Sequence, residues 1–252
     1  MRRELQVFLT AVMFFTKIPC PRWVDHSSEF LNESARYFSL VGVIVGSIGA
    51  AVFWGFSFLF PQSVAVLLSM LATIWLTGAF HEDGLADMFD GFGGGWTKEQ
   101  ILSIMKDSRV GTFGVAGLVG ILALKFISLN ELPAEAVPWL LIAGHASSRF
   151  LASTLILTHD YVRGEPSKAK PVAKEMSPVS VVVSAIFGLL PLLLVPRSWI
   201  WLSLIPMTVV LIYLGHFFKK WIGGHTGDCS GATQQLTEVT FYLSAVVVWS
   251  FI

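Results

Sequence analysis

The sequence predicts an all-α, polytopic membrane protein with about seven spans, and three observations support this fold class. Hydrophobic residues make up 54% of the 252 residues, whereas charged residues make up only 13%, about half of their usual share in soluble domains. The apolar residues gather in long stretches, and most charged residues lie between them. A soluble chain this apolar could not cover its surface, so residues 1–252 are expected to form one integral membrane domain.

The N-terminal run predicts a short helix at the membrane surface. Arg2 and Arg3 precede an apolar run from Leu5 to Phe15, and no small-residue cleavage site follows it. The run is therefore not typical of a cleaved signal peptide. It is also shorter than the roughly 20 apolar residues that a span needs. We expect an interfacial or re-entrant helix here.

Seven longer apolar stretches follow, and each is expected to form one transmembrane helix. Pro61 and Gln62 make a tight turn between the first two, and residues 196–198 join the fifth and the sixth. The last stretch is short, so it is expected to tilt little or to end inside the bilayer. The stretches are Phe38–Phe60, Ser63–Phe80, Val110–Asn130, Ala136–Leu157, Val179–Val195, Trp199–Phe218 and Val239–Ile252.

The connecting segments differ strongly in charge between the two faces of the membrane. Seven spans in series place one set of segments together: residues 1–37, 81–109, 158–178 and 219–238. This face holds 14 of the 17 Lys and Arg residues, and the opposite face holds only Arg197. By the positive-inside rule, the first face and the N-terminus lie in the cytoplasm. Such an asymmetry favours an enzyme at the cytoplasmic surface over a channel or transporter, which needs polar groups through the depth of its spans.

Charge balance and cysteine content exclude other classes. Seventeen basic residues balance seventeen acidic residues, so no nucleic-acid partner is expected. Cys20 and Cys229 lie far apart in the chain and form no CxxC motif. They predict neither a disulfide scaffold nor a zinc knuckle.

The most informative motif runs from His81 to Gly91 and contains four carboxylates, Glu82, Asp83, Asp87 and Asp90. In a helix, the three aspartates fall within about 60° of arc. Like charges this close repel one another, and a divalent cation relieves the repulsion. Oxygen-only ligands favour Mg²⁺ or Mn²⁺ over zinc. The alternative is a solvated acidic helix end.

Two glycine-rich segments accompany this motif. Residues 91–96 predict a loop whose N–H groups face a phosphate, with a flexible turn as the alternative. Arg109 is a candidate phosphate clamp or, equally, a positive-inside anchor. In residues 223–235, Asp228 is a candidate metal ligand or a partner for a hydroxyl nucleophile. The alternative there is a capped helix start at Ser230 or Thr237.

Arg149 lies inside the fourth apolar stretch, where an arginine is costly and usually has a partner. It is expected to meet a carboxylate or a phosphate, with snorkelling to the interface as the alternative. His145, one turn away, is expected to be a packing hydrogen-bonder rather than a catalyst. The glycines at positions 111, 114, 117 and 120 are expected to allow tight helix packing.

The motifs in this order resemble the cobalamin synthase family, the adenosylcobinamide-GDP ribazoletransferases, over nearly the whole chain. The resemblance rests on Phe14-Phe15-Thr16-Lys17-Ile18-Pro19, Tyr37-Phe38-Ser39-Leu40-Val41-Gly42, Phe80-His81-Glu82-Asp83-Gly84-Leu85-Ala86-Asp87 with Asp90-Gly91, Lys106-Asp107-Ser108-Arg109-Val110-Gly111, and Gly227-Asp228 with Gly231-Ala232 and Gln234-Gln235.

The resemblance implies an Mg²⁺-dependent enzyme of the bacterial inner membrane, with Mn²⁺ as a substitute. It implies that adenosylcobinamide-GDP reacts with α-ribazole or its 5′-phosphate to give adenosylcobalamin or its 5′-phosphate and GMP, late in vitamin B12 assembly. One carboxylate of the acidic motif, or Asp228, is expected to accept the hydroxyl proton. Homo-oligomer formation and association with other cobalamin-assembly enzymes stay open.

The expected site lies on the cytoplasmic face in segments 81–111 and 223–236. The expected metal ligands are Glu82, Asp83, Asp87 and Asp90. The expected catalytic residues are Asp83, Asp87, Asp90, Arg109 and Asp228. The expected substrate-binding residues are Gly93, Gly94, Lys106, Ser108, Arg149, Thr226, Gln234 and Gln235.

Two alternatives compete with this reading. The acidic motif is also similar to that of the CDP-alcohol phosphotransferases, which join a nucleotide diphosphate to an alcohol at a membrane. Asp83 and Gly84 agree with that motif, but Asp87 stands where its Ala-Arg run would continue. A metal or corrinoid transporter is the alternative from another functional class, and the charge asymmetry disfavours it.

Overall fold

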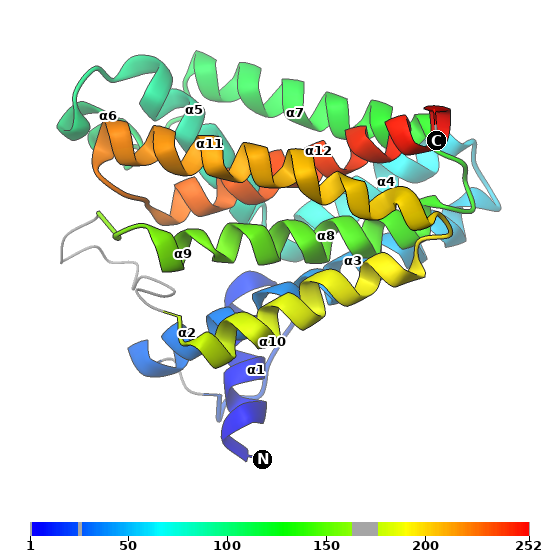
Figure 1. Ribbon diagram of the computed structural model, residues 1–252, viewed down its shortest axis with the longest axis horizontal. Helices are drawn as coiled ribbons and strands as arrows, with labels where there is room; N and C mark the ends of the chain where they lie inside the picture. The colour runs from blue at the N-terminus through cyan, green and yellow to red at the C-terminus, as the bar shows by residue number, and fades with distance from the viewer. Residues whose placement is uncertain (1, 25–26, 163–175, 252) are drawn as a thin grey trace.

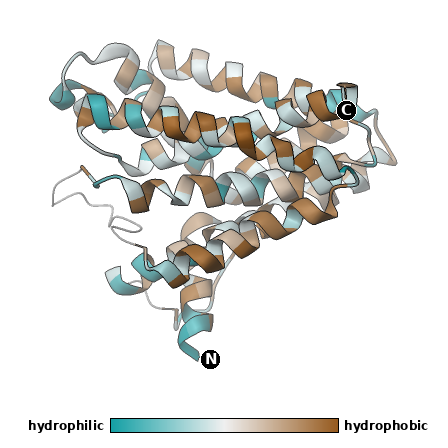
Figure 2. Ribbon diagram, in the orientation of Figure 1, coloured by the Kyte–Doolittle hydropathy of each residue, from teal (hydrophilic) through white to brown (hydrophobic). Residues whose placement is uncertain are grey.

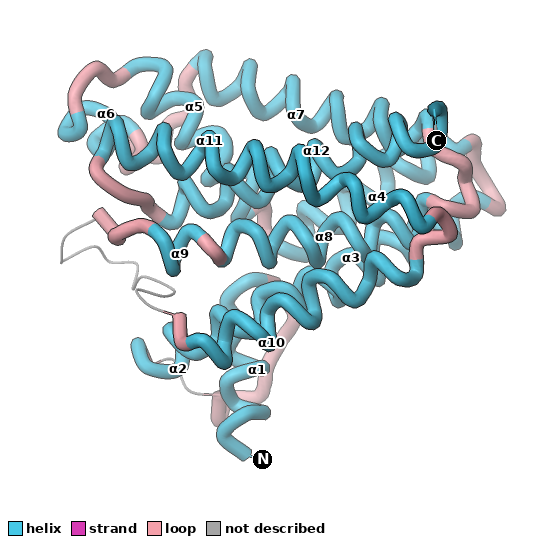
Figure 3. Tube along the Cα trace, in the orientation of Figure 1, coloured by secondary structure: helices cyan, strands magenta, loops and turns pink. Residues whose placement is uncertain are grey.

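The computed structural model describes residues 2–24, 27–162 and 176–251, and within them the fold is helical (Figure 1). Apart from one isolated bridge between Tyr161 and His225, the described residues contain no β-structure (Figure 3). The predicted all-α class is confirmed. The helices are α1 (Arg2–Phe15), α2 (Ser28–Ser34), η1 (Ala35–Tyr37), α3 (Phe38–Ser57), α4 (Gln62–Thr77), α5 (Phe80–Gly94), α6 (Lys98–Ile104), α7 (Thr112–Glu131), α8 (Val137–Ser153), α9 (Leu155–Thr158), α10 (Pro178–Leu189), η2 (Leu190–Leu194), η3 (Ser198–Ser203), α11 (Leu204–Ile222) and α12 (Gly227–Phe251).

Several of these helices are suited to a lipid environment. Within the described part of the chain, four segments are long and apolar enough to cross a membrane, and the bent pair α4–α5 brings the number to five. Hydrophobic residues run along α7, α10 and α11 (Figure 2), and many of their large apolar side chains are exposed. The protein is therefore a multi-pass membrane protein. The count of seven spans stays a prediction, and most of segment 158–178 lies outside the described residues.

The second apolar stretch ends earlier than predicted, at a sharp bend. Gly78 and Ala79 adopt the left-handed backbone conformation, with φ of 67° and 58°, and α5 leaves α4 at an angle of 88°. The backbone N–H of Lys17 donates to the carbonyl of Leu76 at 2.7 Å, which ties the segment after α1 to the bend. The acidic motif therefore opens a helix, where the helix dipole favours negative charge.

The last helix begins much earlier than the predicted stretch Val239–Ile252. Helix α12 starts at Gly227, because Thr226 caps it by accepting the N–H of Cys229 at 3.2 Å. Its polar residues are buried against other helices, and Glu238 is fully buried. The prediction that residues 219–238 form a cytoplasmic connection is therefore wrong for all but the short link between α11 and α12.

Close backbone approaches hold the bundle together. A Cβ on Gly46 of α3 would lie 2.7 Å from the Cα of Ile142 in α8, so these two helices meet at a distance that only glycine permits. On α7, Gly114 and Gly117 pack against α5 as predicted, whereas Gly120 faces open space. Helix α8 is buried along most of its length. The interior around α8 and α12 is where the polar residues collect.

Candidate active site

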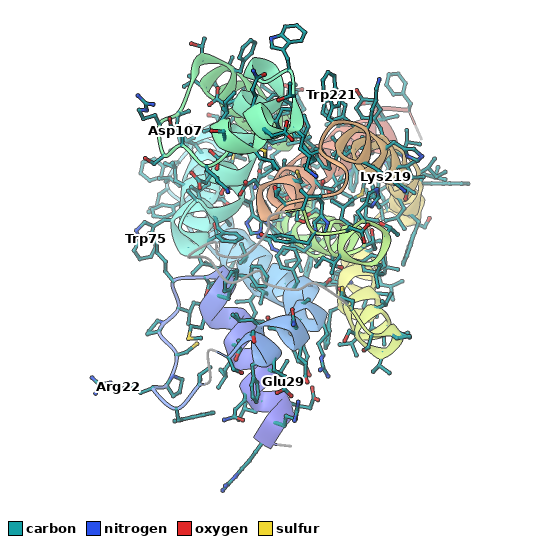
Figure 4. The ribbon with its side chains drawn as sticks, turned by 90° about the vertical axis from the view of Figure 1, so that its left-hand side faces the viewer. Arg22, Glu29, Trp75, Asp107, Lys219 and Trp221 are labelled. Carbon is teal, nitrogen blue, oxygen red and sulfur yellow. The ribbon has the colours of Figure 1, made fainter. Side chains whose placement is uncertain are left out.

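The two predicted site segments lie side by side where α5 meets α12. A Cβ on Gly84 would lie 3.0 Å from the Cα of Asp228, and one on Gly231 would lie 3.4 Å from the Cα of His81. The first turns of both helices are thus in direct contact. Figure 4 views the molecule from this end, with Asp107 on one side and Lys219 on the other. The structure therefore brings the acidic motif and the second glycine-rich segment together.

The four carboxylates of the motif do not share one environment. Asp83 is exposed and Asp87 is half-buried, whereas Glu82 and Asp90 are buried. Within the described ranges, no group of three or more His, Cys, Asp or Glu side chains is arranged to hold a metal ion. The predicted four-carboxylate site is therefore not assembled in this structure.

Asp90 caps a neighbouring helix. Its two carboxylate oxygens accept the backbone N–H groups of Gly111 at 2.6 Å and Gly114 at 2.8 Å, at the N-terminus of α7. These donors have no partner within their own helix, so the carboxylate satisfies them and complements the helix dipole. A Cβ on either glycine would collide with Asp90. The structure thus gives Asp90 a structural contact that the sequence analysis did not predict.

Glu82 points to a different side of α5 and joins a buried network. Its Oε1 accepts the side-chain Nε2 of Gln235 at 2.9 Å. Its Oε2 is buried and has no hydrogen-bond partner among the described residues. Gln235 also donates Nε2 to the Oε1 of Gln234 at 3.0 Å. Gln234 and Gln235 are buried, and the side-chain nitrogen of each donates within the protein.

A buried cluster around Glu238 lies next to these glutamines. Lys125 of α7 forms an ion pair with Glu238 at 2.6 Å, and Nδ1 of His145 on α8 lies 3.3 Å from the second carboxylate oxygen. Tyr242 donates its hydroxyl to Glu238 at 3.0 Å, and Gln234 donates at 2.6 Å. We call these five residues the Glu238 cluster. A carboxylate removed from water is tolerated because each of its oxygens has two partners.

Arg149 is fully buried, so the snorkelling alternative is wrong. Its Nη1 lies 3.1 Å from His145 Nδ1 and donates to the His145 carbonyl at 2.9 Å. The guanidinium also lies over the Phe38 ring at 5.7 Å, and the His81 ring stacks on that phenylalanine at 5.6 Å. Among the described residues, no carboxylate lies within ion-pair distance of Arg149. His145 makes hydrogen-bond contacts inside the protein, as expected.

Several buried polar atoms near Glu82 have no partner within the described ranges. They are His81 Nδ1 and Nε2, Glu82 Oε2, Arg149 Nε and Gln235 Oε1, and His145 Nε2 shares this property. We call His81, Glu82, Arg149 and Gln235 the Glu82 group. Buried polar groups in native proteins are nearly always hydrogen-bonded, so such a concentration indicates a place that water or a polar ligand completes.

The loop predicted after the acidic motif is wrong, because α5 continues to Gly94. In a helix, the N–H groups of Gly93 and Gly94 bond to carbonyls one turn earlier and do not face a phosphate. Their neighbour Gly91 allows α6 to approach, since a Cβ there would lie 3.2 Å from Met105 Sδ. A Cβ on Gly93 would lie 2.6 Å from the Phe113 ring. Packing of α6 and α7 explains glycine at positions 91 and 93.

The predicted phosphate contacts between α6 and α7 are at the surface. Lys106, Ser108 and Arg109 are exposed. Arg109 donates to both oxygens of Asp107, from Nη2 at 2.7 Å and from Nε at 3.0 Å. Hydrogen bonds from Arg109 lower the pKa of the Asp107 carboxyl to about 2. Arg109 therefore lies outside the buried network and has a local partner.

Backbone hydrogen bonds from residues 160–162 hold the link before α12. His225 donates its backbone N–H to the carbonyl of Asp160 at 2.9 Å, and Val162 donates to the carbonyl of His225 at 3.0 Å. Burial lowers the pKa of the His225 imidazole, although a hydrogen bond to the Asp160 backbone acts in the opposite direction. Thr226 is buried and caps α12, so the capped helix start that competed with substrate binding is present, at Thr226 rather than at Ser230 or Thr237.

The sequence analysis missed Lys125, Glu238 and Tyr242. A signal for them existed. Lys125 interrupts an apolar span, where a charge requires a partner. Gln234, Glu238 and Tyr242 recur every four residues, which places them on one face of a helix. Taking α12 to begin at Val239 concealed this face.

Comparison with known proteins shows the family to which the chain belongs. The family model described as cobalamin-5-phosphate synthase matches residues 7–247. The chain is 47% identical over 251 residues to a Shewanella frigidimarina protein named adenosylcobinamide-GDP ribazoletransferase, covering 98% of this chain and 96% of that protein. A relative of the same name from Shewanella amazonensis is 46% identical, with 99% and 98% covered. No solved structure matches. The chain belongs to the cobalamin-5-phosphate synthase family.

Proposed function

We propose that the protein is an adenosylcobinamide-GDP ribazoletransferase. A hydroxyl of α-ribazole or its 5′-phosphate attacks the phosphorus that carries cobinamide, the bond from that phosphorus to GMP breaks, and the hydroxyl proton passes to a base of the protein. The observation that carries this proposal is the identity of 47% to a relative of that name over 98% of the chain. The meeting of the first turns of α5 and α12 supports a site there.

We propose that Mg²⁺, with Mn²⁺ as a substitute, accompanies the diphosphate. Mg²⁺ is commonly held by one or two carboxylates together with substrate phosphates rather than by a complete protein cage. Asp83 and Asp87 lie on the less buried side of α5, and Asp228, in the first turn of α12, packs against Gly84 of α5. All three side chains are oxygen donors, the ligand type that Mg²⁺ prefers. When bound, the ion neutralises charge on the displaced GMP.

Among the carboxylates, Glu82 is our choice of proton acceptor. On a helix it lies about 80–140° away from the three aspartates, so it is separate from the metal side. Gln235 holds one of its oxygens, and the other has no partner among the described residues. A general base needs such an oriented carboxylate with one oxygen that no protein group occupies. We also propose that Lys106, Ser108 and Arg109, which are exposed, contact the nucleotide.

We propose that the end of the bundle where α5 meets α12 lies on the cytoplasmic side of a bacterial inner membrane, because the positively charged residues gather on that side. A reporter at residue 96 is expected inside the cell.

The test is the purified protein in proteoliposomes with adenosylcobinamide-GDP, α-ribazole and Mg²⁺. GMP and a corrinoid that has gained ribazole should form in equal amounts, and EDTA should stop the reaction. Corrinoid uptake without GMP release would support a transporter and overturn the proposal.

A further inference from the structure

The proposed reaction leaves the Glu238 cluster without a role, although its charged residues are buried at a high desolvation cost. Lys125 and Glu238 are 2% and 0% exposed. Replacing such an ion pair by apolar residues is often neutral or stabilising, so stability alone does not explain it. The cluster does, however, touch the residues that hold Glu82.

Hydrogen bonds through the side-chain amides of Gln234 and Gln235 connect Glu238 with Glu82. The amide nitrogen of Gln234 donates to Glu238 at 2.6 Å and to Ser148 at 3.0 Å, so its carbonyl faces Gln235. Gln235 then presents its amide nitrogen, which donates to Gln234 at 3.0 Å and to Glu82 at 2.9 Å. The negative charge of Glu238 thus determines that a donor reaches Glu82.

The ion pair between Lys125 and Glu238 also connects two helices. Lys125 belongs to α7, whose N-terminus is capped by Asp90 of α5. Glu238 belongs to α12, which packs along α5 at Gly84. Helices α5, α7 and α12 therefore form a closed frame with Glu82 and Gln235 on its inside. The ion pair between Lys125 and Glu238 links α7 to α12, so its loss removes one of the contacts between these two helices.

We propose that Glu238 and Lys125 are positioning residues for the transfer reaction. Glu238 fixes the orientation of the side-chain amides of Gln234 and Gln235. In this orientation Gln235 donates an N–H to Glu82 and does not turn its carbonyl toward that carboxylate. Lys125 neutralises Glu238 and fixes its place. This inference rests on the proposed role of Glu82.

The decisive variant removes both charges together. Glu238→Leu combined with Lys125→Met leaves no unmatched charge, so the melting temperature in detergent should fall less than in Glu238→Leu alone, although the buried Tyr242 and Gln234 lose their acceptor. The kcat per folded molecule should still fall by about 10- to 100-fold, the usual effect of losing a partner that orients a reactive group, with KM nearly unchanged. Wild-type kcat in this double variant would overturn the proposal.

A second variant covers the case in which the double variant does not fold. Gln234→Leu keeps the ion pair but breaks the amide chain, and it should lower kcat to a similar degree. A wild-type kcat in Gln234→Leu would also overturn the proposal. The matched control is Ser184→Ala, which removes a buried hydrogen bond of 2.8 Å to Ser39 far from the amide chain. It should leave kcat unchanged.

A coupling measurement separates positioning from a structural role. In a Gln235→Leu background the chain is already broken, so removing the Lys125–Glu238 pair should change kcat by less than about twofold. Independent effects that multiply would contradict the proposal. Glu82→Gln tests the prior step: normal kcat there refutes the role of Glu82, whereas a wild-type protein that releases no GMP refutes the proposed function.

Discussion

The Glu238 cluster and the Glu82 group are neighbours in the same interior but differ in how their polar atoms are satisfied. Both oxygens of Glu238 accept from two partners each, drawn from α7, α8 and α12. In the Glu82 group, every member has a buried polar atom without a partner among the described residues. An unsatisfied buried group costs about 1–3 kcal/mol. The comparison indicates that the Glu238 cluster holds the helices in place, whereas the Glu82 group has free hydrogen-bonding capacity for water or a polar ligand.

The largest effect is expected when the satisfied region loses one charge. Glu238→Leu leaves Lys125 buried and unmatched, which should lower the free energy of unfolding by about 3–5 kcal/mol. The melting temperature in detergent measures this loss. A wild-type melting temperature would mean that water already reaches Lys125, and the contrast between the two regions would fail.

The next effect falls on activity at the exposed side of α5. Asp83→Asn removes one charge from a carboxylate that is exposed in the structure, so folding should be unaffected. Loss of a metal ligand should lower the GMP release rate by about 100-fold or more, and added Mg²⁺ should restore part of it. Normal turnover would show that Asp83 belongs to a solvated helix face and holds no metal ion.

Asp90→Asn should lower stability more than turnover, in contrast to Asp83→Asn. The amide has one acceptor oxygen in place of two, so either Gly111 or the buried Gly114 loses its acceptor, at about 1–3 kcal/mol for a buried donor. The melting temperature should fall, and turnover per folded molecule should fall less than in Asp83→Asn. A stable but inactive Asp90→Asn protein would return Asp90 to the metal site.

Arg149 tests the boundary between the two regions. Arg149→Lys keeps the charge but loses the planar contact with Phe38, which should cost about 1 kcal/mol of stability. Arg149→Ala should be less stable, because it also removes the donor to His145. Equal melting temperatures for both variants and the wild type would show that the guanidinium makes no net contribution.

The smallest effect concerns pH. Burial holds the pKa of His225 below its usual 6.5, so the unfolded chain binds this proton more readily than the folded protein does. Stability should therefore decrease as pH falls from above 6.5 toward the lowered pKa. The drop in melting temperature between pH 7.5 and 5.5 should be smaller in His225→Asn than in the wild type. An identical drop in both proteins would remove His225 as a cause.

Much of the fold was predictable from local properties of the sequence. Helix formation and membrane insertion depend on runs of apolar residues, and these runs are visible without knowing their neighbours. The angular spacing of Asp83, Asp87 and Asp90 is also local, since it follows from helical geometry. Glu82 was grouped with them by proximity in sequence, although the same geometry turns it toward another side.

The tertiary structure alone decided which polar groups meet. Lys125 and Glu238 are far apart in the chain, and Asp90 reaches α7 only because α5 turns back at Gly78 and Ala79. Hydropathy assigned Glu238 to a solvated connection because its neighbours are polar. In the folded protein those polar neighbours satisfy one another, so the segment is buried. A residue's need for a partner is local, but the partner's identity depends on how the helices pack.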